Sequence, residues 1–306
     1  MDYSKADFNE KQNCCGCSAC YNICPTGCIH MLEDLEGFIY PKIDKAYCIN
    51  CNLCKKVCPI LNRKEQIETP VFYGSKNKDG GIRLKSSSGG IFFSIAEYVI
   101  SNDGIVFGAA FVNNMVLEHI EVDNIEGLYK LMGSKYLQSN IKNTYSKVEQ
   151  YLKKNKIVLF TGTPCQIAGL KTYLQKDYEH LYLVDVVCHG APSPKVFREY
   201  IEELSTLNET EIKDIYFRDK RSGWVNANIA INFKNGKDIV TPIRDNIYHK
   251  GFIGHLFLRP SCHTCNFNYF KSGSDITIGD FWGINDSNPE FYDDKGVSLV
   301  IVKTDI

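Results

Sequence analysis

The most constraining feature of this 306-residue chain is a run of cysteines that occurs twice near its start. Both runs follow the pattern C-x2-C-x2-C-x3-C-P, and the second begins 34 residues after the first. The runs comprise Cys14, Cys17, Cys20 and Cys24, and then Cys48, Cys51, Cys54 and Cys58. Thiolates at every third position suit a chain that turns tightly around a metal centre, and the proline keeps that turn from continuing as a helix. The spacing therefore predicts metal binding.

The cysteine content as a whole favours metal over disulfides. Ten of the 14 cysteines precede residue 59, so composition marks a boundary there. Residues 1–10 are polar and acidic, unlike a secretory signal peptide. Without an export signal, dense cysteine indicates metal sites. We therefore expect a cytoplasmic protein, with one domain over residues 1–65 and a larger one over residues 66–306.

The repeated pattern is typical of bacterial two-cluster ferredoxins, in which three close thiolates hold one 4Fe-4S cluster and the fourth cysteine binds the other cluster. The first cluster is expected on Cys14, Cys17, Cys20 and Cys58, and the second on Cys24, Cys48, Cys51 and Cys54. Zinc is the alternative, but a four-thiolate zinc site does not need two such runs. Residues 29–32 and 38–43 are predicted to form a hairpin between the runs.

Two further cysteines, Cys15 and Cys28, fall outside this spacing. Only Cys14 gives the correct interval to Cys17, so Cys15 is not expected to be a ligand in its place. We expect both residues to be small and buried beside the clusters, where a free thiol packs like an apolar group.

The charge distribution argues against nucleic acid or a membrane as the main partner. The formal net charge is −1 and no run of Lys or Arg exceeds two residues, whereas phosphate binding needs a clustered basic face. The longest apolar stretch, residues 91–100, is interrupted by Ser94 and Glu97. It is too short to span a bilayer, so no membrane span is expected.

From about residue 69 the pattern changes to alternating strands and helices. Strands are predicted over residues 71–75, 105–111, 115–122, 157–160, 181–187, 275–279 and 297–302. Helices are predicted over residues 90–100, 144–154, 164–174 and 194–204, and a hairpin over residues 229–240. The predicted fold class is α+β / α/β, a small two-cluster ferredoxin-like domain followed by a larger α/β domain whose partly parallel sheet is made mixed by hairpins.

A loop of small residues, Ser86-Ser87-Ser88-Gly89-Gly90, directly precedes the helix predicted at residues 90–100. Small residues at the start of a helix leave backbone N–H groups free to hold an anion, usually a phosphate. The alternative is a serine N-cap beside a flexible loop. The loop by itself favours neither interpretation.

Four cysteines remain in the second part of the chain. They are Cys165, Cys188, Cys262 and Cys265. The first two follow predicted strands, at the edge where open α/β sheets bind ligands. Thr163 and Pro164 suit the cap and first position of a helix, which places Cys165 in its first turn, where the helix dipole favours a thiolate. Four cysteines can hold a third 4Fe-4S cluster, and the alternatives are zinc, a redox dithiol or no metal.

Six segments together resemble one known family. They are residues 86–90, 133–139, 162–170, 188–193, 259–267 and 274–283. As a set these segments resemble the coenzyme F420 hydrogenase/dehydrogenase beta-subunit family, and the similarity runs from about residue 10 to the end of the chain. Family members usually continue for many tens of residues beyond the last segment. We therefore expect a short or truncated version, or a dispensable C-terminal segment.

The resemblance implies FAD beside a 4Fe-4S cluster in the larger domain. It implies that Ser87, Ser88, Gly89 and Gly90 contact the flavin phosphate, and that Lys135 places a charge near the flavin. The alternative for Lys135 is a solvated lysine at a helix end. It also implies that the four later cysteines bind the inner cluster. Asp275 and Asp280 could cap turns or face the flavin, and a structural role is the favoured interpretation.

The function that these expectations support is that of an iron–sulfur flavoprotein oxidoreductase. A ferredoxin or another redox protein is the expected partner, an oligomer is possible, and the sequence does not specify the small-molecule acceptor. One alternative is a non-catalytic electron-transfer subunit that passes electrons to a partner enzyme. Another is a scaffold whose larger domain has lost the flavin.

Overall fold

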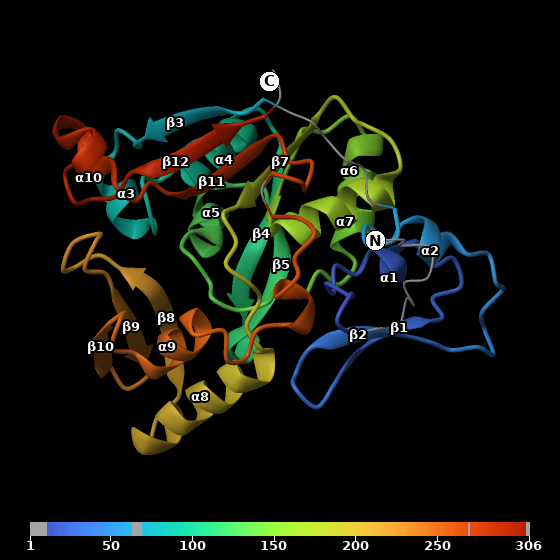
Figure 1. Cartoon of the computed structure of the whole chain (residues 1–306), viewed down its shortest axis with the longest axis horizontal. Coiled ribbons are helices and arrows are strands. Elements are labelled where there is room, and N and C mark those ends of the chain that lie inside the picture. The colour runs from blue at the N-terminus through green and yellow to red at the C-terminus, as the bar shows by residue number, and fades with distance from the viewer. Residues whose placement is uncertain (1–10, 63–68, 269, 304–306) are drawn as a thin grey trace.

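A computed structural model describes residues 11–62, 69–268 and 270–303. Residues 1–10, on which the argument about export depends, and the last three residues lie outside this description. The chain forms an N-terminal module, a seven-stranded sheet with helices on both faces, and a separate three-stranded sheet (Figure 1). Residues 11–62 are called the ferredoxin module below.

The ferredoxin module contains one hairpin and two short helices. Strands β1 (Ile29–Glu33) and β2 (Ile39–Ile43) pair antiparallel, which confirms the predicted hairpin. Helices α1 (Ala19–Ile23) and α2 (Leu53–Lys56) each begin inside a cysteine run. The module's own buried cluster consists only of Cys20, Cys28 and Ile29, so apolar packing within it is slight.

The seven-stranded sheet has the order β3-β12-β11-β7-β6-β4-β5. Its strands are β3 (Val71–Ser75), β4 (Ile105–Val112), β5 (Val116–Val122), β6 (Val158–Gly162), β7 (Leu181–Val186), β11 (Ile276–Asp280) and β12 (Ser298–Val302). The four strands from β11 to β4 run parallel, and β12, β3 and β5 pair antiparallel with their neighbours. The sheet is therefore mixed, as the sequence predicts.

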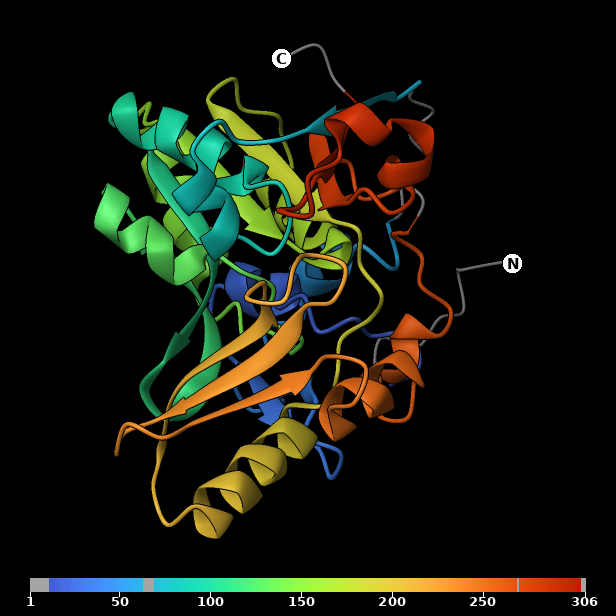
Figure 2. The same ribbon diagram turned by 90° about the vertical axis from the view of Figure 1, so that its left-hand side faces the viewer.

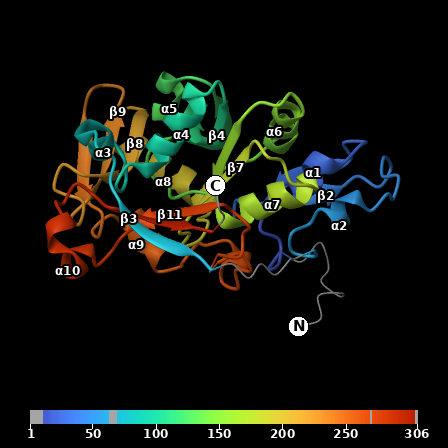
Figure 3. The same ribbon diagram turned by 90° about the horizontal axis from the view of Figure 1, so that it is seen from above.

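Helices cover both faces of this sheet because strand residues alternate between the two sides. Helices α4 (Ile91–Ser101) and α5 (Ile125–Leu131) pack on one face, and α6 (Thr144–Lys153) and α7 (Pro164–Leu174) pack on the other. The short helix α3 (Gly80–Lys85) precedes α4. The core under α6 and α7 also includes Cys15, Cys17 and Val57, so the ferredoxin module packs on this face. Figures 1 and 3 show α1 beside α7.

The three-stranded sheet is the main departure from the predicted topology. Strands β9 (Asn228–Phe233) and β10 (Asp238–Pro242) form the expected hairpin, but β9 pairs with β8 (Ile212–Asp219) and not with the large sheet. Figure 2 shows this sheet apart from the larger one, beside α8 (Pro194–Leu207). Phe197 of α8 and Phe217 of β8 are buried in one core together with α9 (Ile247–Ile253), and this packing holds the sheet as a separate layer.

Candidate metal centres

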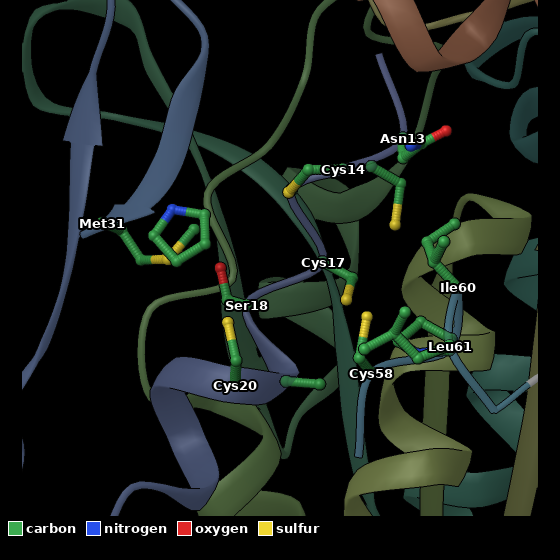
Figure 4. A pocket seen from close by; sticks show the side chains of 14 residues that line it. Asn13, Cys14, Cys17, Ser18, Cys20, Met31, Cys58, Ile60 and Leu61 are labelled. Atoms are coloured by element: carbon green, nitrogen blue, oxygen red, sulfur yellow. The ribbon is translucent and has the colours of Figure 1, made fainter. Parts of the chain in front are cut away.

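Four cysteines from both runs line one cavity of the ferredoxin module. They are Cys14, Cys17, Cys20 and Cys58. The cavity opens to solvent and is otherwise lined mainly by apolar groups such as Met31, Ile60 and Leu61. Figure 4 shows these four side chains around a common space. The structure thus brings together the four residues assigned to the first cluster, including the one from the second run.

A second cavity of about 330 Å³ holds the other predicted set. Its cysteines are Cys24, Cys48, Cys51 and Cys54. Apolar residues such as Ile29, Ile43 and Leu53 also line it. Cys51 is exposed, so this second site lies at the surface of the molecule. The fold therefore places Cys58 with the first run and Cys24 with the second, and their role as cluster ligands stays a prediction.

The thiols of the first cavity suit a cationic group. Burial raises the pKa of Cys20 and Cys58, and negative charge on the neighbouring Cys14 would raise both further. Thiolates at these positions consequently need a nearby positive charge, which the iron of a cluster supplies. The donor set of four sulfurs in each cavity fits a 4Fe-4S cluster. Among the described residues, no group of three or more His, Cys, Asp or Glu is arranged for a single metal ion.

The two cysteines outside the spacing are buried, as the sequence predicts. Cys28 lies 3.5 Å from Cys24, measured between the sulfurs, in the second cavity. Cys15 lines the first cavity, and its thiol is within hydrogen-bonding contact of both Cys17 and Cys165. The spacing gave no indication of this second contact, which connects the ferredoxin module to the larger domain.

The four later cysteines, called the inner cysteine group below, lie close together. Burial raises the pKa of Cys188, and charge on Cys165, Cys262 and Cys265 would raise it further. Cys165 lies in the first turn of α7, where Pro164 begins the helix as expected. The Cys262 sulfur accepts a hydrogen bond of 3.3 Å from a backbone N–H. Three separate segments of the chain thus bring these half-buried cysteines close to one another.

The small-residue loop at residues 86–90 is held mostly by internal contacts. The Ser87 hydroxyl accepts a hydrogen bond of 2.6 Å from the Ser134 N–H, and the Ser88 hydroxyl donates to Val297 over 2.9 Å. The Gly89 N–H donates to the Ser298 hydroxyl over 3.0 Å. Gly90, with φ of 85°, is the N-cap of α4. The loop lies at the start of a helix as predicted. Its two hydroxyls join it to Ser134 and Val297, and the Gly89 N–H joins it to the first residue of β12.

Lys135 lies at the carboxyl end of α5. Its Nζ donates to the carbonyls of Lys130, Leu131 and Met132 at 3.2, 2.7 and 2.7 Å. A lysine in this place stabilises the last turn of a helix through the free carbonyls and the dipole. The structure therefore places Lys135 at a helix end, as the alternative interpretation has it, although half-buried and not fully solvated.

Asp280, at the end of β11, connects the two sheets. Its carboxylate accepts a hydrogen bond of 2.9 Å from the Trp224 indole and lies 3.4 Å from the guanidinium of Arg218, which belongs to β8. Asp275 accepts a hydrogen bond of 2.7 Å from the Leu183 N–H in β7. Both aspartates therefore have structural partners, as the sequence suggested.

Comparison with known proteins agrees with this arrangement. A family model described as "4Fe-4S dicluster domain" matches residues 13–61. A second model, which describes the carboxyl-terminal part of the beta subunit of coenzyme F420 hydrogenase/dehydrogenase, matches residues 155–306. The chain belongs to this beta-subunit family. It is thus an iron–sulfur electron-transfer protein of the F420 hydrogenase family, with 4Fe-4S clusters in its dicluster domain.

A solved structure shares the fold of this beta-subunit-family protein. It is a chain of the F420-reducing nickel–iron hydrogenase complex from Methanosarcina barkeri, in a xenon derivative. The TM-score is 0.51 at 18% sequence identity, and the similarity covers 78% of each chain. No curated protein matches the sequence. Among the described residues, no helix has the length and apolar character needed to cross a membrane.

The ferredoxin module is fixed to the rest of this family member by its hairpin as well as by its cysteines. The Ser193 hydroxyl, at the cap of α8, donates to the Glu36 carbonyl in the β1–β2 turn. Arg198 on the same helix forms an ion pair with Glu33. The module is therefore anchored to α8 as well as to α7.

Proposed function

We propose that this protein is an iron–sulfur flavoprotein oxidoreductase that passes electrons between a ferredoxin-type partner and a small-molecule substrate. The two-cluster domain would occupy residues 1–65 and the flavin-binding domain residues 66–306. In the proposal, the inner cysteine group holds a third 4Fe-4S cluster and residues 87–90 contact FAD. A bound flavin exchanges single electrons with clusters and electron pairs with a substrate.

One observation carries the proposal. Cys15 is buried at the first cluster site, and its side chain interacts both with Cys17 of that site and with Cys165 of the inner cysteine group, so the two sites adjoin. A carrier that only exchanged electrons at its surface would not need a buried route of this kind. The exposed Cys51 at the second site supplies the opposite end of the route, where a partner can approach.

The residues of the chain line these sites with mainly apolar groups. Cys20 is buried, Cys58 is half-buried, and Ile60 and Leu61 line the first cavity. The flavin assignment has a different basis. It depends on the family resemblance and on the position of Ser87 to Gly90 at the start of an 11-residue helix, whose free N–H groups favour phosphate.

Anaerobic purification tests the proposal. We expect flavin absorption beside the cluster absorption and about 12 iron atoms per chain from three clusters. About eight iron atoms and no flavin would overturn both the third cluster and the flavin. Zinc in place of iron at the inner cysteine group would overturn the third cluster alone, and metal analysis distinguishes the two results.

The second candidate is an electron-transfer subunit that serves a partner enzyme. It is favoured by the structural similarity to a chain of a hydrogenase complex. In that case a reduced ferredoxin would reduce the bound flavin, but the flavin would reduce none of the deazaflavin, quinone, disulfide or sugar-derived acceptors. Direct reduction of any of these by the isolated protein would favour the enzyme.

A further inference from the structure

One arginine lies between the ferredoxin module and the inner cysteine group. Arg259 is 1% exposed and directly precedes the Pro260–Cys262 turn, whose last residue belongs to the inner group. The Cys262 N–H donates to the Arg259 carbonyl over 2.8 Å. The backbone of Arg259 thus belongs to the larger domain, while its side chain extends the other way.

The guanidinium group of Arg259 contacts the ferredoxin module through two of its nitrogens. Nε donates to the Cys14 carbonyl over 2.7 Å, and Nη2 donates to the Ile39 carbonyl over 2.9 Å. Nη2 is also 3.8 Å from the Cys14 sulfur. The third nitrogen, Nη1, donates to the Gln138 side chain over 3.0 Å. The group therefore touches both the backbone and the sulfur of a cluster ligand.

The surroundings are shaped for a planar cation. The guanidinium carbon lies 4.2 Å from the centre of the Tyr40 ring and 5.5 Å from that of Phe38. At Gly16 a Cβ atom would come within 2.8 Å of Nη1, and φ there is +68°, so only glycine leaves the space without strain. Lysine cannot form the same fork of contacts.

The charge of Arg259 lacks an acidic partner. Among the residues that the structure describes, no Asp or Glu forms an ion pair with it, and apart from the contact with the Cys14 sulfur its hydrogen bonds go to neutral carbonyl groups. A buried charge is costly unless an opposite charge lies nearby. A cluster held by Cys14 would supply the opposite charge, because the Cys14 sulfur lies 3.8 Å from Nη2.

We propose that Arg259 is a positioning residue that raises the reduction potential of the first cluster, the one held by Cys14, Cys17, Cys20 and Cys58. Reduction adds one electron, and so one negative charge, to the cluster and its thiolates. A buried cation beside one ligand stabilises the reduced form more than the oxidised form. The same side chain fixes the module against the larger domain, because its contacts join Cys14 and Ile39 to the segment that bears Cys262.

This inference depends on the clusters of the dicluster domain and not on the flavin or the inner cluster. It can therefore fail while the proposed function holds, and the proposed function can fail while this inference holds. The experiment is an EPR-monitored redox titration of the anaerobically purified full chain, with dithionite as reductant. The variants are Arg259→Gln, which removes the charge, and Arg259→Lys, which keeps it. Arg198→Gln is the matched control, because it also removes an arginine that contacts the module.

The expected result is a lower midpoint potential for the first cluster in Arg259→Gln, with the second cluster unchanged. Arg259→Lys should stay closer to wild type than Arg259→Gln, and Arg198→Gln should match wild type. Equal potentials in wild type and Arg259→Gln at unchanged iron content would overturn the proposal. If Arg259→Gln does not fold, the Arg259→Lys variant tests the proposal instead. A marked fall in the midpoint potential of its first cluster, at unchanged iron content, would contradict the proposal because the positive charge is retained.

Discussion

The run to which a cysteine belongs in the sequence does not always match the cavity that it lines. Cys58 belongs to the second run in sequence but lines the first cavity, together with Cys14, Cys17 and Cys20. Cys58→Ser should therefore remove the first cluster and leave the second, because three thiolates and an alcohol hold a cluster poorly. We expect a loss of about four iron atoms per chain, measured by iron analysis, and loss of the first cluster's EPR signal.

Cys28→Ser is the control for this prediction. Cys28 is 4% exposed and lies beside the second cavity, but it falls outside the repeated spacing. The iron content of the Cys28→Ser variant should match that of wild type. Retention of the full iron content by Cys58→Ser would contradict the crossed assignment, and loss of iron from Cys28→Ser would show that it is a ligand.

A buried histidine gives the fold a pH dependence. Burial lowers the pKa of His119 to about 4, and its ring nitrogens contact the Ser139 hydroxyl and the Thr161 carbonyl at 2.9 Å each. Since the unfolded histidine titrates near 6.5, the unfolded chain binds the proton first as the pH falls. Stability from neutral His119 is therefore present above about pH 6.5 and is lost toward pH 4, by about 2 kcal/mol at pH 5.

Thermal unfolding at pH 7 and pH 5 measures this effect. Between pH 7 and pH 5 the His119→Gln variant should lose less stability than wild type does, although the variant is less stable than wild type at pH 7. His180→Gln, which changes an exposed histidine, should keep the wild-type dependence. Equal losses in wild type and His119→Gln would show that His119 does not contribute.

At the scale of elements, the contact between α7 and the ferredoxin module depends on one glycine. A Cβ atom at Gly169 would lie 2.8 Å from the Cys17 Cβ and 2.9 Å from the Tyr145 hydroxyl. Gly169→Ala should therefore push the Cys17 loop away, at a cost of about 1–3 kcal/mol. We expect a lower melting temperature and less iron in the purified protein. Gly80→Ala, at a helix position with nothing within 4 Å, should change neither.

The elements that the sequence predicted well carry strong local signals. Helix α7 begins at Pro164 as expected, because threonine and proline define its start. Strand β8 was missed because Lys213, Asp214 and Arg218 interrupt its apolar pattern. The sequence predicted the hairpin of β9 and β10 but not the separate sheet to which it belongs. That sheet depends on the pairing of β9 with β8, and the local sequence pattern does not show which strand a hairpin pairs with.

The candidate site divides in the same way. The cysteines of the two cavities were predictable because the spacing itself encodes a cluster. Arg259 was not, since a lone arginine has no spacing to interpret and its contacts reach 245 residues back to Cys14 and 220 back to Ile39. The contact between Cys15 and Cys165 was also invisible, because it exists only once the module is docked.

At the scale of the whole molecule, the ferredoxin module depends on its metal. Its own buried cluster is dominated by cysteines, so removal of iron takes away most of what organises it. Oxidative removal of iron should make residues 11–62 sensitive to protease while the large sheet and its helices stay resistant. Limited proteolysis followed by mass spectrometry measures this, with the iron-loaded protein as control. Equal protection of the module with and without iron would show that docking alone holds it.

The exchange of cysteines between the two runs has a consequence for how the protein matures in the cell. Each cavity borrows one sulfur from the other run, so a cluster inserted into either cavity draws both runs into place. The second cluster is then inserted into a site whose cysteines are already in position. Under iron shortage, the population should divide into fully loaded and empty molecules, with few half-loaded ones that could trap an electron without passing it on.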